Sequence, residues 1–123
     1  MKKVYVAGAM SADNILEMLQ NIHDGIKLGA QCLKKGFAPF VPHLDIFFRI
    51  QNGEAVDVPV TTYYEYTMAW LHVTDYMILC PNYKNSVGTQ AEIAKAKELG
   101  IPVFYNLEEL ENYEKGEDKC LCH

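Results

Sequence analysis

Short apolar runs alternate with longer amphipathic segments along the chain, and this alternation limits the possible folds more than any other feature. Residues 3–8 read Lys-Val-Tyr-Val-Ala-Gly, a β-branched and aromatic run stopped by glycine that predicts a buried strand. Further strands are predicted at residues 37–41, 75–80 and 101–105. Helical patterns separate all four, and strands that alternate with helices are typical of a parallel sheet covered on both faces.

The first and longest helical pattern covers residues 15–33 and has clear start and stop signals. Asn14 and Glu17 form a capping pattern at its start, and Gly36 follows its end. Its apolar residues recur every three or four positions, so we expect them to form one stripe that faces the core. That stripe consists of Ile15, Leu19, Ile22, Ile26, Ala30 and Leu33.

Three later segments also read as helices. Thr62 and Glu65 form a capping box that opens the first of them, which we expect to run to Val73. The other two are predicted at residues 88–99 and 107–113. The order of elements is therefore strand, helix, strand, helix, strand, helix, strand and a last short helix.

These elements predict a flavodoxin-like (Rossmann-like) α/β domain of three layers, with a four- to five-stranded, mainly parallel sheet. Residues 43–60 lack a clean period and predict an irregular excursion with one helical turn at residues 44–50. The chain has 123 residues, too few for two independent cores, so we assign residues 1–113 to one domain. Residues 114–123 are expected to form a flexible, acidic tail that contains cysteine.

The charge balance argues against a nucleic-acid polymer as a partner. The chain carries a formal net charge of −5, from 11 Lys and Arg residues against 16 Asp and Glu residues. A surface that binds nucleic acid needs clustered Arg and Lys, and Arg49 is the only arginine in the sequence. Most of the acidity lies at residues 108–119, so the remaining body is nearly neutral and does not repel an anionic small molecule.

The length of the apolar runs and the positions of the cysteines indicate the cellular compartment. No apolar run approaches the roughly 20 residues of a membrane span, and residues 1–10 do not read as a signal peptide. We therefore predict a cytoplasmic protein with no membrane partner, in which Cys32 and Cys80 are reduced core residues. Residues 120–123, Cys-Leu-Cys-His, could hold a metal, but no second ligand pair has zinc-site spacing. A disordered end is favoured, and no metal or organic cofactor is predicted.

Two loops are equipped to bind a ligand, because ligands of open α/β sheets bind outside the carboxyl ends of the strands. Residues 8–11 follow the first strand, and their small side chains let the backbone approach a ligand. Residues 82–89 follow the third strand and enter a helix, whose free N–H groups attract anions such as phosphate. The candidate substrate-binding residues are Tyr5, Gly8, Ala9, Met10, Ser11, Asn14, Lys84, Ser86 and Gly88.

Glu92 follows the second loop, in the first turn of the predicted helix. Thr89 and Glu92 have the spacing of a capping box, which gives the glutamate a purely structural role and is favoured on spacing alone. Alternatively, its carboxylate faces the ligand site and takes part in chemistry, with the helix N-terminus keeping it ionised. Both interpretations stay open at this point.

Three motifs occur in order between residues 3 and 105. They are Tyr5-Val6-Ala7-Gly8-Ala9-Met10, Trp70-Leu71-x-x-x-Asp75 and Ser86-x-Gly88-x-x-x-Glu92-x-x-x-Ala96. Together they resemble the nucleoside 2-deoxyribosyltransferase family, which includes N-glycosidases of nucleoside 5′-monophosphates and small uncharacterised bacterial and phage domains. The resemblance implies cleavage or transfer at the N-glycosidic bond of a nucleotide or nucleoside. It also implies that Glu92 is the nucleophile and forms a glycosyl ester, which water or a second base resolves.

The chain departs from this family at the position of an acid. Several relatives carry an acidic residue three positions before Trp70, where this chain has Thr67, and threonine is no general acid at neutral pH. His43 and Asp45 are the remaining catalytic candidates, although each could be an ordinary loop residue. The missing acid keeps open a second function, a non-catalytic nucleotide sensor on the same fold. A third possible function is a protein-interaction domain, which is disfavoured because it gives Glu92 no role.

The resemblance also implies a 5′-phosphate on the substrate. In relatives that use free nucleosides, an aspartate commonly stands six positions before the nucleophile and accepts a hydrogen bond from the 5′-hydroxyl, whereas phosphate-using relatives have serine. Ser86 occupies that position, with Lys84 two residues away. The first loop lacks the arginine of some monophosphate-cleaving relatives, so Ser11 and Asn14 would have to serve instead.

Four aromatic residues cluster in the helix that precedes the third strand, namely Tyr63, Tyr64, Tyr66 and Trp70. Core packing, an oligomer interface and stacking on a substrate base are all open roles for them. The family is dimeric or larger, and a small core cannot cover so much apolar surface. We therefore predict a homodimer or a larger homo-oligomer.

Overall fold

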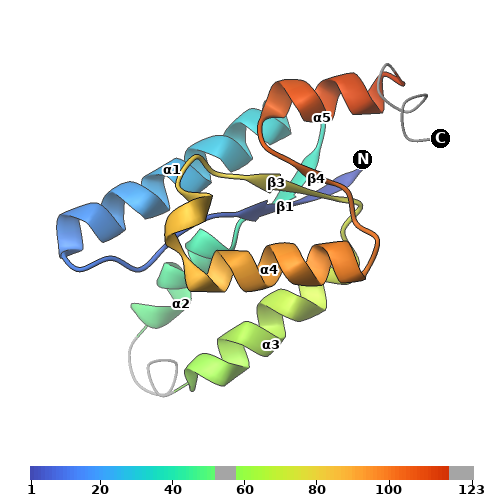
Figure 1. Ribbon diagram of the computed structural model, residues 1–123. Helices are drawn as coiled ribbons and strands as arrows, with labels where there is room; N and C mark the ends of the chain where they lie inside the picture. Colours follow the sequence, from blue (N-terminus) through green and yellow to red (C-terminus); the bar gives the residue numbers. More distant parts are fainter. Residues whose placement is uncertain (52–57, 117–123) are drawn as a thin grey trace.

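The computed structural model describes residues 1–51 and 58–116, and this part of the chain contains a four-stranded parallel sheet in the order β2-β1-β3-β4 (Figure 1). The strands are β1 (Lys3–Ala7), β2 (Ala38–Phe40), β3 (Tyr76–Leu79) and β4 (Val103–Phe104). Each lies within a predicted run, and Tyr5 pairs with Phe40 on one side and Met77 on the other. The predicted flavodoxin-like fold class is therefore confirmed.

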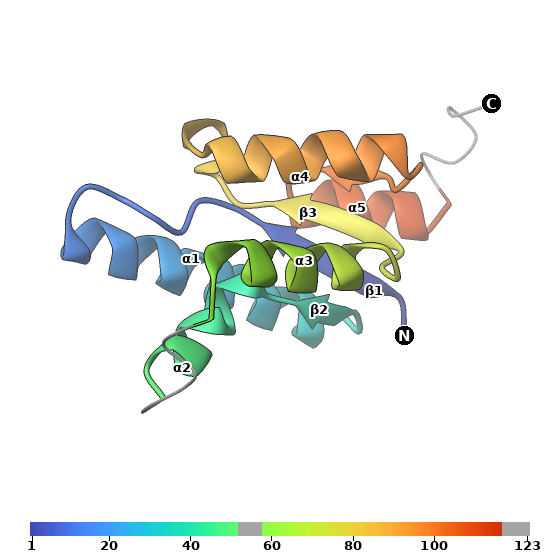
Figure 2. The ribbon, with the colours of Figure 1, turned by 90° about the horizontal axis from the view of Figure 1, so that it is seen from below.

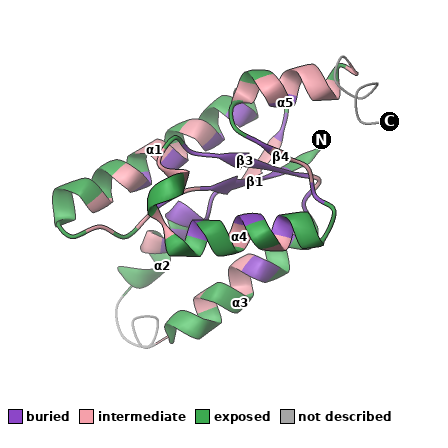
Figure 3. Ribbon diagram, viewed as in Figure 1, coloured by how far each residue is buried: buried purple, intermediate pink, exposed green. Residues whose placement is uncertain are grey.

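Helices cover both faces of the sheet, because successive residues of the inner strands point to opposite sides and are apolar on both. The long helices are α1 (Ile15–Lys34), α3 (Val60–Leu71), α4 (Val87–Glu98) and α5 (Leu107–Glu114). Val4 and Val6 share one core cluster with α1 and α5, whereas Tyr5 and Ala7 share another with α3 and α4. Figures 1 and 2 show these helix pairs on opposite sides of the sheet, and Figure 3 shows β1 and β3 buried almost throughout.

The predicted apolar stripe of α1 is wrong in part. Ile22 is buried, but Ile15, Leu19 and Leu33 are exposed, and the other buried residues of the helix are Gly25, Gly29 and Cys32. A Cβ added at Gly25 would stand 2.4 Å from the His43 ring, and one at Gly29 would stand 2.4 Å from Val41. The helix therefore turns its glycines toward the core and lies closer to β2 and to the short turn η1 (Pro42–Asp45) than larger residues would allow.

The predicted capping residue is found at the start of α1 but not at the start of α3. Asn14 caps α1, and its Oδ1 accepts a hydrogen bond from the Glu17 N–H at 2.9 Å, as predicted. The predicted capping box at Thr62 is wrong, because α3 begins at Val60, directly after Pro59. A proline fixes its own φ, so Pro59 fixes the backbone direction at the start of the first turn without a side-chain cap. The Thr62 N–H donates to the Pro59 carbonyl at 3.0 Å.

The irregular segment after β2 forms two short pieces, η1 (Pro42–Asp45) and α2 (Ile46–Arg49), which confirms the helical turn predicted there. A further short turn, η3 (Tyr83–Asn85), follows β3. Cys32 and Cys80 are buried and free, as predicted, and burial raises the pKa of their thiols to about 11 and about 12 respectively.

The described residues also bear on membranes and metals. In residues 1–51 and 58–116, no helix has the length and apolar character needed to cross a bilayer. Within the same ranges, no three or more His, Cys, Asp or Glu side chains gather where they could hold a metal ion. The Cys-Leu-Cys-His sequence at residues 120–123 lies outside the described residues, as does most of the predicted tail.

Candidate active site

A cavity of about 470 Å³ opens at the carboxyl ends of β1, β2 and β3, the edge where open α/β sheets bind ligands. Its wall comes from the loop after β1, from η1 and α2, from α3, and from η3 with the first half of α4. The predicted site residues that line it are Gly8, Met10, Ser11, His43, Asp45, Ser86, Gly88 and Glu92. Segments far apart in the sequence thus meet at one place.

Ala9 and Asn14, both predicted to bind substrate, serve the protein's own structure. The Ala9 N–H donates to Asn82 Oδ1 at 3.1 Å. Asn82 donates to Asn21 Oδ1 at 3.1 Å, and Asn21 donates to the Met10 carbonyl at 3.4 Å. This chain of hydrogen bonds fixes the loop after β1, while Asn14 is occupied as the cap of α1.

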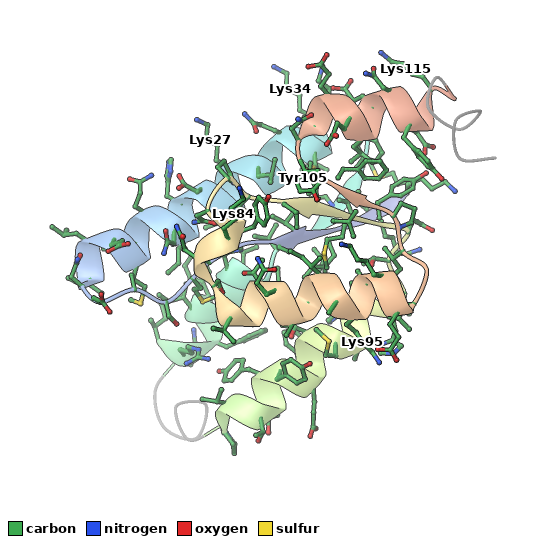
Figure 4. The ribbon with its side chains drawn as sticks, in the orientation of Figure 1. Lys27, Lys34, Lys84, Lys95, Tyr105 and Lys115 are labelled. Carbon is green, nitrogen blue, oxygen red and sulfur yellow. The ribbon has the colours of Figure 1, made fainter. Side chains whose placement is uncertain are left out.

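Lys84 does not line the cavity, although its place in the second loop predicts that it binds substrate. Its Nζ lies over the Tyr83 ring, 5.8 Å from the ring centroid. In Figure 4, Lys84 lies on the side of the molecule toward Lys27 and Tyr105. The turn at η3 directs Lys84 away from the cavity. A loop has no regular period, so the sequence pattern does not show this direction.

Arg49 and Thr89 also line the cavity, although neither is among the predicted site residues. Arg49 comes from α2, and its guanidinium carbon lies 4.3 Å from the centroid of the Tyr63 ring. Thr89 lies in the first turn of α4, and its buried Oγ1 has no hydrogen-bond partner among the described residues. The spacing of Arg49, four positions after Asp45, is the only sequence signal that could have placed it here.

The start of α4 differs from the predicted capping box. Ser86 is the N-cap, and its Oγ accepts a hydrogen bond from the Thr89 N–H at 3.1 Å. The helix begins at Val87, so Glu92 lies in the second turn, past the unpaired N–H groups that a cap satisfies. The predicted box of Thr89 and Glu92 is therefore wrong, and the Glu92 carboxylate is free for another role.

Glu92 points toward the sheet, where its Oε2 accepts a hydrogen bond from the buried hydroxyl of Tyr5. Burial raises the pKa of Glu92 to about 7; the hydrogen bond from Tyr5 acts to lower this pKa, and the charge of Asp45 acts to raise it. This differs from the expectation that the helix N-terminus keeps the carboxylate ionised, because burial raises the pKa by more than the Tyr5 hydrogen bond lowers it. Burial and the carboxylate together raise the pKa of Tyr5 far above its ordinary value, so Tyr5 remains a donor.

Asp45 and His43 bring two further polar groups to the cavity, both from η1. Burial raises the pKa of Asp45 to about 6, and the charge of Arg49 opposes this rise. Burial lowers the pKa of His43, although the nearby Ala9 backbone and the charge of Asp24 both act to raise it. The imidazole is therefore neutral near pH 7. Neither of its ring nitrogens has a hydrogen-bond partner within the described part of the chain. The cavity thus combines two carboxyl groups that hold protons unusually well.

The Glu92→Gln variant is expected to be more stable than the wild type at pH 8 and equally stable at pH 4. The folded state binds the Glu92 proton more tightly than the unfolded chain does, since the pKa rises from 4.5 to about 7. This contribution is complete below pH 4.5 and disappears as the pH rises through about 7. Glutamine never ionises, so the gain at pH 8 is about 3 kcal/mol. Chemical denaturation at both pH values measures it, and lower stability of the variant at pH 8 would contradict the expectation.

Comparison with known proteins relates the chain to a family and to solved structures. Residues 2–105 match the family model described as "Domain of unknown function (DUF4406)". No curated protein matches the chain. Among solved structures, a 2-deoxyribosyltransferase from the psychrotolerant bacterium Bacillus psychrosaccharolyticus superimposes with a TM-score of 0.57 at 19% sequence identity, over 85% of this chain and 72% of that chain. At this identity the likeness shows a shared fold.

Proposed function

We propose that this chain, which belongs to the family described as "Domain of unknown function (DUF4406)", cleaves or transfers the N-glycosidic bond of a nucleotide or nucleoside. The observation that carries the proposal is the half-buried Glu92 carboxylate, which accepts a hydrogen bond from Tyr5 at the wall of a cavity at the carboxyl edge of the sheet. The solved structure that shares the fold is a 2-deoxyribosyltransferase, which supports the same class of reaction.

In the proposed reaction, a carboxylate oxygen of Glu92 bonds to C1′ of the sugar while the bond from C1′ to the base nitrogen breaks. The electron pair of that bond goes to the base, and an ester between the sugar and Glu92 remains. Water or a second base then bonds to C1′ and releases the carboxylate. Partial removal of Glu92 from water favours this chemistry, because the carboxylate then stabilises the positive charge that develops at C1′.

The proposed substrate carries a 5′-phosphate, which the first turn of α4 binds. Ser86 and Gly88 line the cavity there, and the buried Oγ1 of Thr89 is unpaired in the described part of the chain. Backbone N–H groups at a helix start favour an anion, and among the described residues the cavity wall includes the cation of Arg49 and not that of Lys84. This pattern of donors suits a phosphate better than an uncharged hydroxyl.

The function is tested by incubating the protein with a panel of nucleosides and nucleoside 5′-monophosphates and separating the products by chromatography. Free base is the expected product, in larger yield from a monophosphate than from its nucleoside. A second base added to the reaction distinguishes transfer, which yields a new nucleotide, from hydrolysis. Binding of a panel member without release of base would instead support the alternative function, a non-catalytic nucleotide sensor.

A homodimer or larger homo-oligomer is part of the same proposal. Apolar side chains stay exposed around α2 and α3; they include Phe47, Phe48, Ile50, Val60 and Trp70. Trp70 also stacks on Phe40, with ring centroids 5.4 Å apart, whereas Tyr63 and Tyr64 line the cavity. The aromatic cluster therefore divides between core packing, the cavity and an exposed surface. Burial of that surface against a second copy would remove it from water.

Light scattering at micromolar concentration is expected to give at least twice the chain mass of 14.0 kDa. Phe47→Glu should lower this mass to that of the monomer, because a carboxylate is costly to bury in an apolar interface. Leu33→Glu is the matched control, since Leu33 is exposed to a similar degree on α1, across the sheet from α3. A monomeric wild type, or a Phe47→Glu variant of unchanged mass, would contradict the proposal.

A further inference from the structure

Glycosyl transfer to Glu92 needs a second group, because a neutral leaving base has to gain a proton as its bond to C1′ breaks. Thr67 lines the cavity, but its hydroxyl donates to the Tyr64 carbonyl at 3.0 Å and has no acidic proton to give. Among the described residues, Asp45 is the second carboxyl group on the cavity wall besides Glu92.

The fold brings Asp45 and Glu92 to the cavity from different sides of β1. Asp45 ends η1, directly after the edge strand β2, whereas Glu92 lies on α4 after β3, and β1 pairs with both strands. Asp45 is only 6% exposed although it lies in a short connecting segment. Its charge also acts on Glu92, which places the two carboxyl groups within electrostatic reach of each other across the cavity.

We propose that Asp45 is the general acid and base of the reaction, which gives its proton to the leaving base and later takes a proton from the attacking water. This inference rests on the proposed function. In the first step, the Asp45 proton moves to the base nitrogen that receives the electron pair of the C1′–N bond. In the second step, the ionised Asp45 accepts a proton from water as the water oxygen bonds to C1′ and the Glu92 carboxylate leaves.

The groups around Asp45 favour this role over the same role for His43. The charge of Asp45 acts on Glu92 of α4, Tyr5 of β1 and Tyr66 of α3, and the charge of Arg49 of α2 acts on Asp45. Burial outweighs the charge of Arg49, so the pKa of Asp45 rises to about 6. The reactive form of the pair is the one in which Asp45 carries the proton and Glu92 is ionised. His43 has the opposite response to burial, because its charged form is the protonated one, so near pH 7 it seldom carries the proton that a general acid must give.

The test compares the wild type with Asp45→Asn on two substrates. One is the panel member that releases base best, and the other is 7-methylguanosine 5′-monophosphate, whose methylated base departs without gaining a proton. On the first, kcat is expected to fall at least about 100-fold with little change in KM, and the alkaline limb of the pH–rate profile should vanish. On the second, kcat should fall less than about tenfold. Asp13→Asn, an exposed aspartate outside the cavity wall, is the control and should match the wild type on both.

Each other outcome separates the inference from the proposed function. Equal losses on both substrates, a rise in KM alone, or a retained alkaline limb would overturn the role of Asp45 and leave Glu92 as the nucleophile. Circular dichroism of Asp45→Asn checks that the fold is intact, and Asp45→Glu should recover part of kcat because it restores a carboxyl group. A wild type that releases no base from any substrate would overturn the proposed function itself, and the role of Asp45 with it.

Discussion

Replacement of Glu92 by glutamine is expected to lower kcat for base release by at least about 10³-fold. An amide oxygen is a poor nucleophile toward C1′, and it brings no negative charge to the positive charge that develops there. The side chain keeps its size, its place in the second turn of α4 and an oxygen that can accept the hydrogen bond from Tyr5. The loss is therefore chemical and does not come from unfolding.

Glu98→Gln on the same helix is the matched control for this variant. Glu98 is exposed and lies near Lys95, with 3.4 Å between the charged atoms, far from the cavity wall. The control should therefore retain the kcat of the wild type. If Glu92→Gln keeps an activity close to that of the wild type, Glu92 is not the nucleophile.

Ser86→Asp is expected to lower kcat/KM for a 5′-monophosphate by at least about 100-fold, or about 2.7 kcal/mol. The substitution replaces a hydroxyl donor by a carboxylate that repels phosphate at the first turn of α4. Aspartate is as good an N-cap as serine, so the helix start should persist. Use of the corresponding nucleoside should fall much less, because its 5′-hydroxyl can donate to the new carboxylate.

Asn106→Asp makes a comparable change at the N-cap of α5 and serves as the control. The Asn106 Oδ1 accepts a hydrogen bond from the Glu109 N–H at 2.9 Å, outside the cavity wall, so its replacement should leave both activities unchanged. Steady-state kinetics on a nucleoside and its monophosphate measures the preference. An equal preference in the wild type, or full monophosphate use in Ser86→Asp, would contradict phosphate binding at this helix.

The strands and the order of elements could be predicted because each element has its own pattern within a short stretch of sequence. The run at residues 3–8 and the apolar segment before Pro81 mark β1 and β3 without knowledge of their neighbours. The stripe of α1 could not be predicted in this way, since Gly25 faces the core only because the His43 ring packs against it. Hydrophobic spacing counts large side chains and takes no account of a helix that approaches through its glycines.

The site was predictable as a set of loops, but its internal geometry was not. Gly8, Ser86 and Glu92 were placed at the carboxyl edge by the order of the strands, and the structure puts all three on the cavity wall. The contact between Tyr5 and Glu92 spans 87 positions of sequence, and no local pattern encodes it. The raised pKa of Glu92 has the same origin, because burial depends on how α4 packs on the sheet.

The central claim, that Glu92 becomes covalently attached to the sugar, is tested most directly by mass spectrometry. The wild type is incubated with a 2′-fluorinated nucleoside 5′-monophosphate, in which the fluorine destabilises positive charge at C1′ and slows hydrolysis of the ester. The protein is then digested with a protease and the masses of its peptides are measured. The claim predicts that the peptide containing Glu92 gains the mass of one fluorinated sugar phosphate, in step with the base released, and that Glu92→Gln gains none. Release of base with no mass gain on that peptide, or an adduct on another residue, would contradict it.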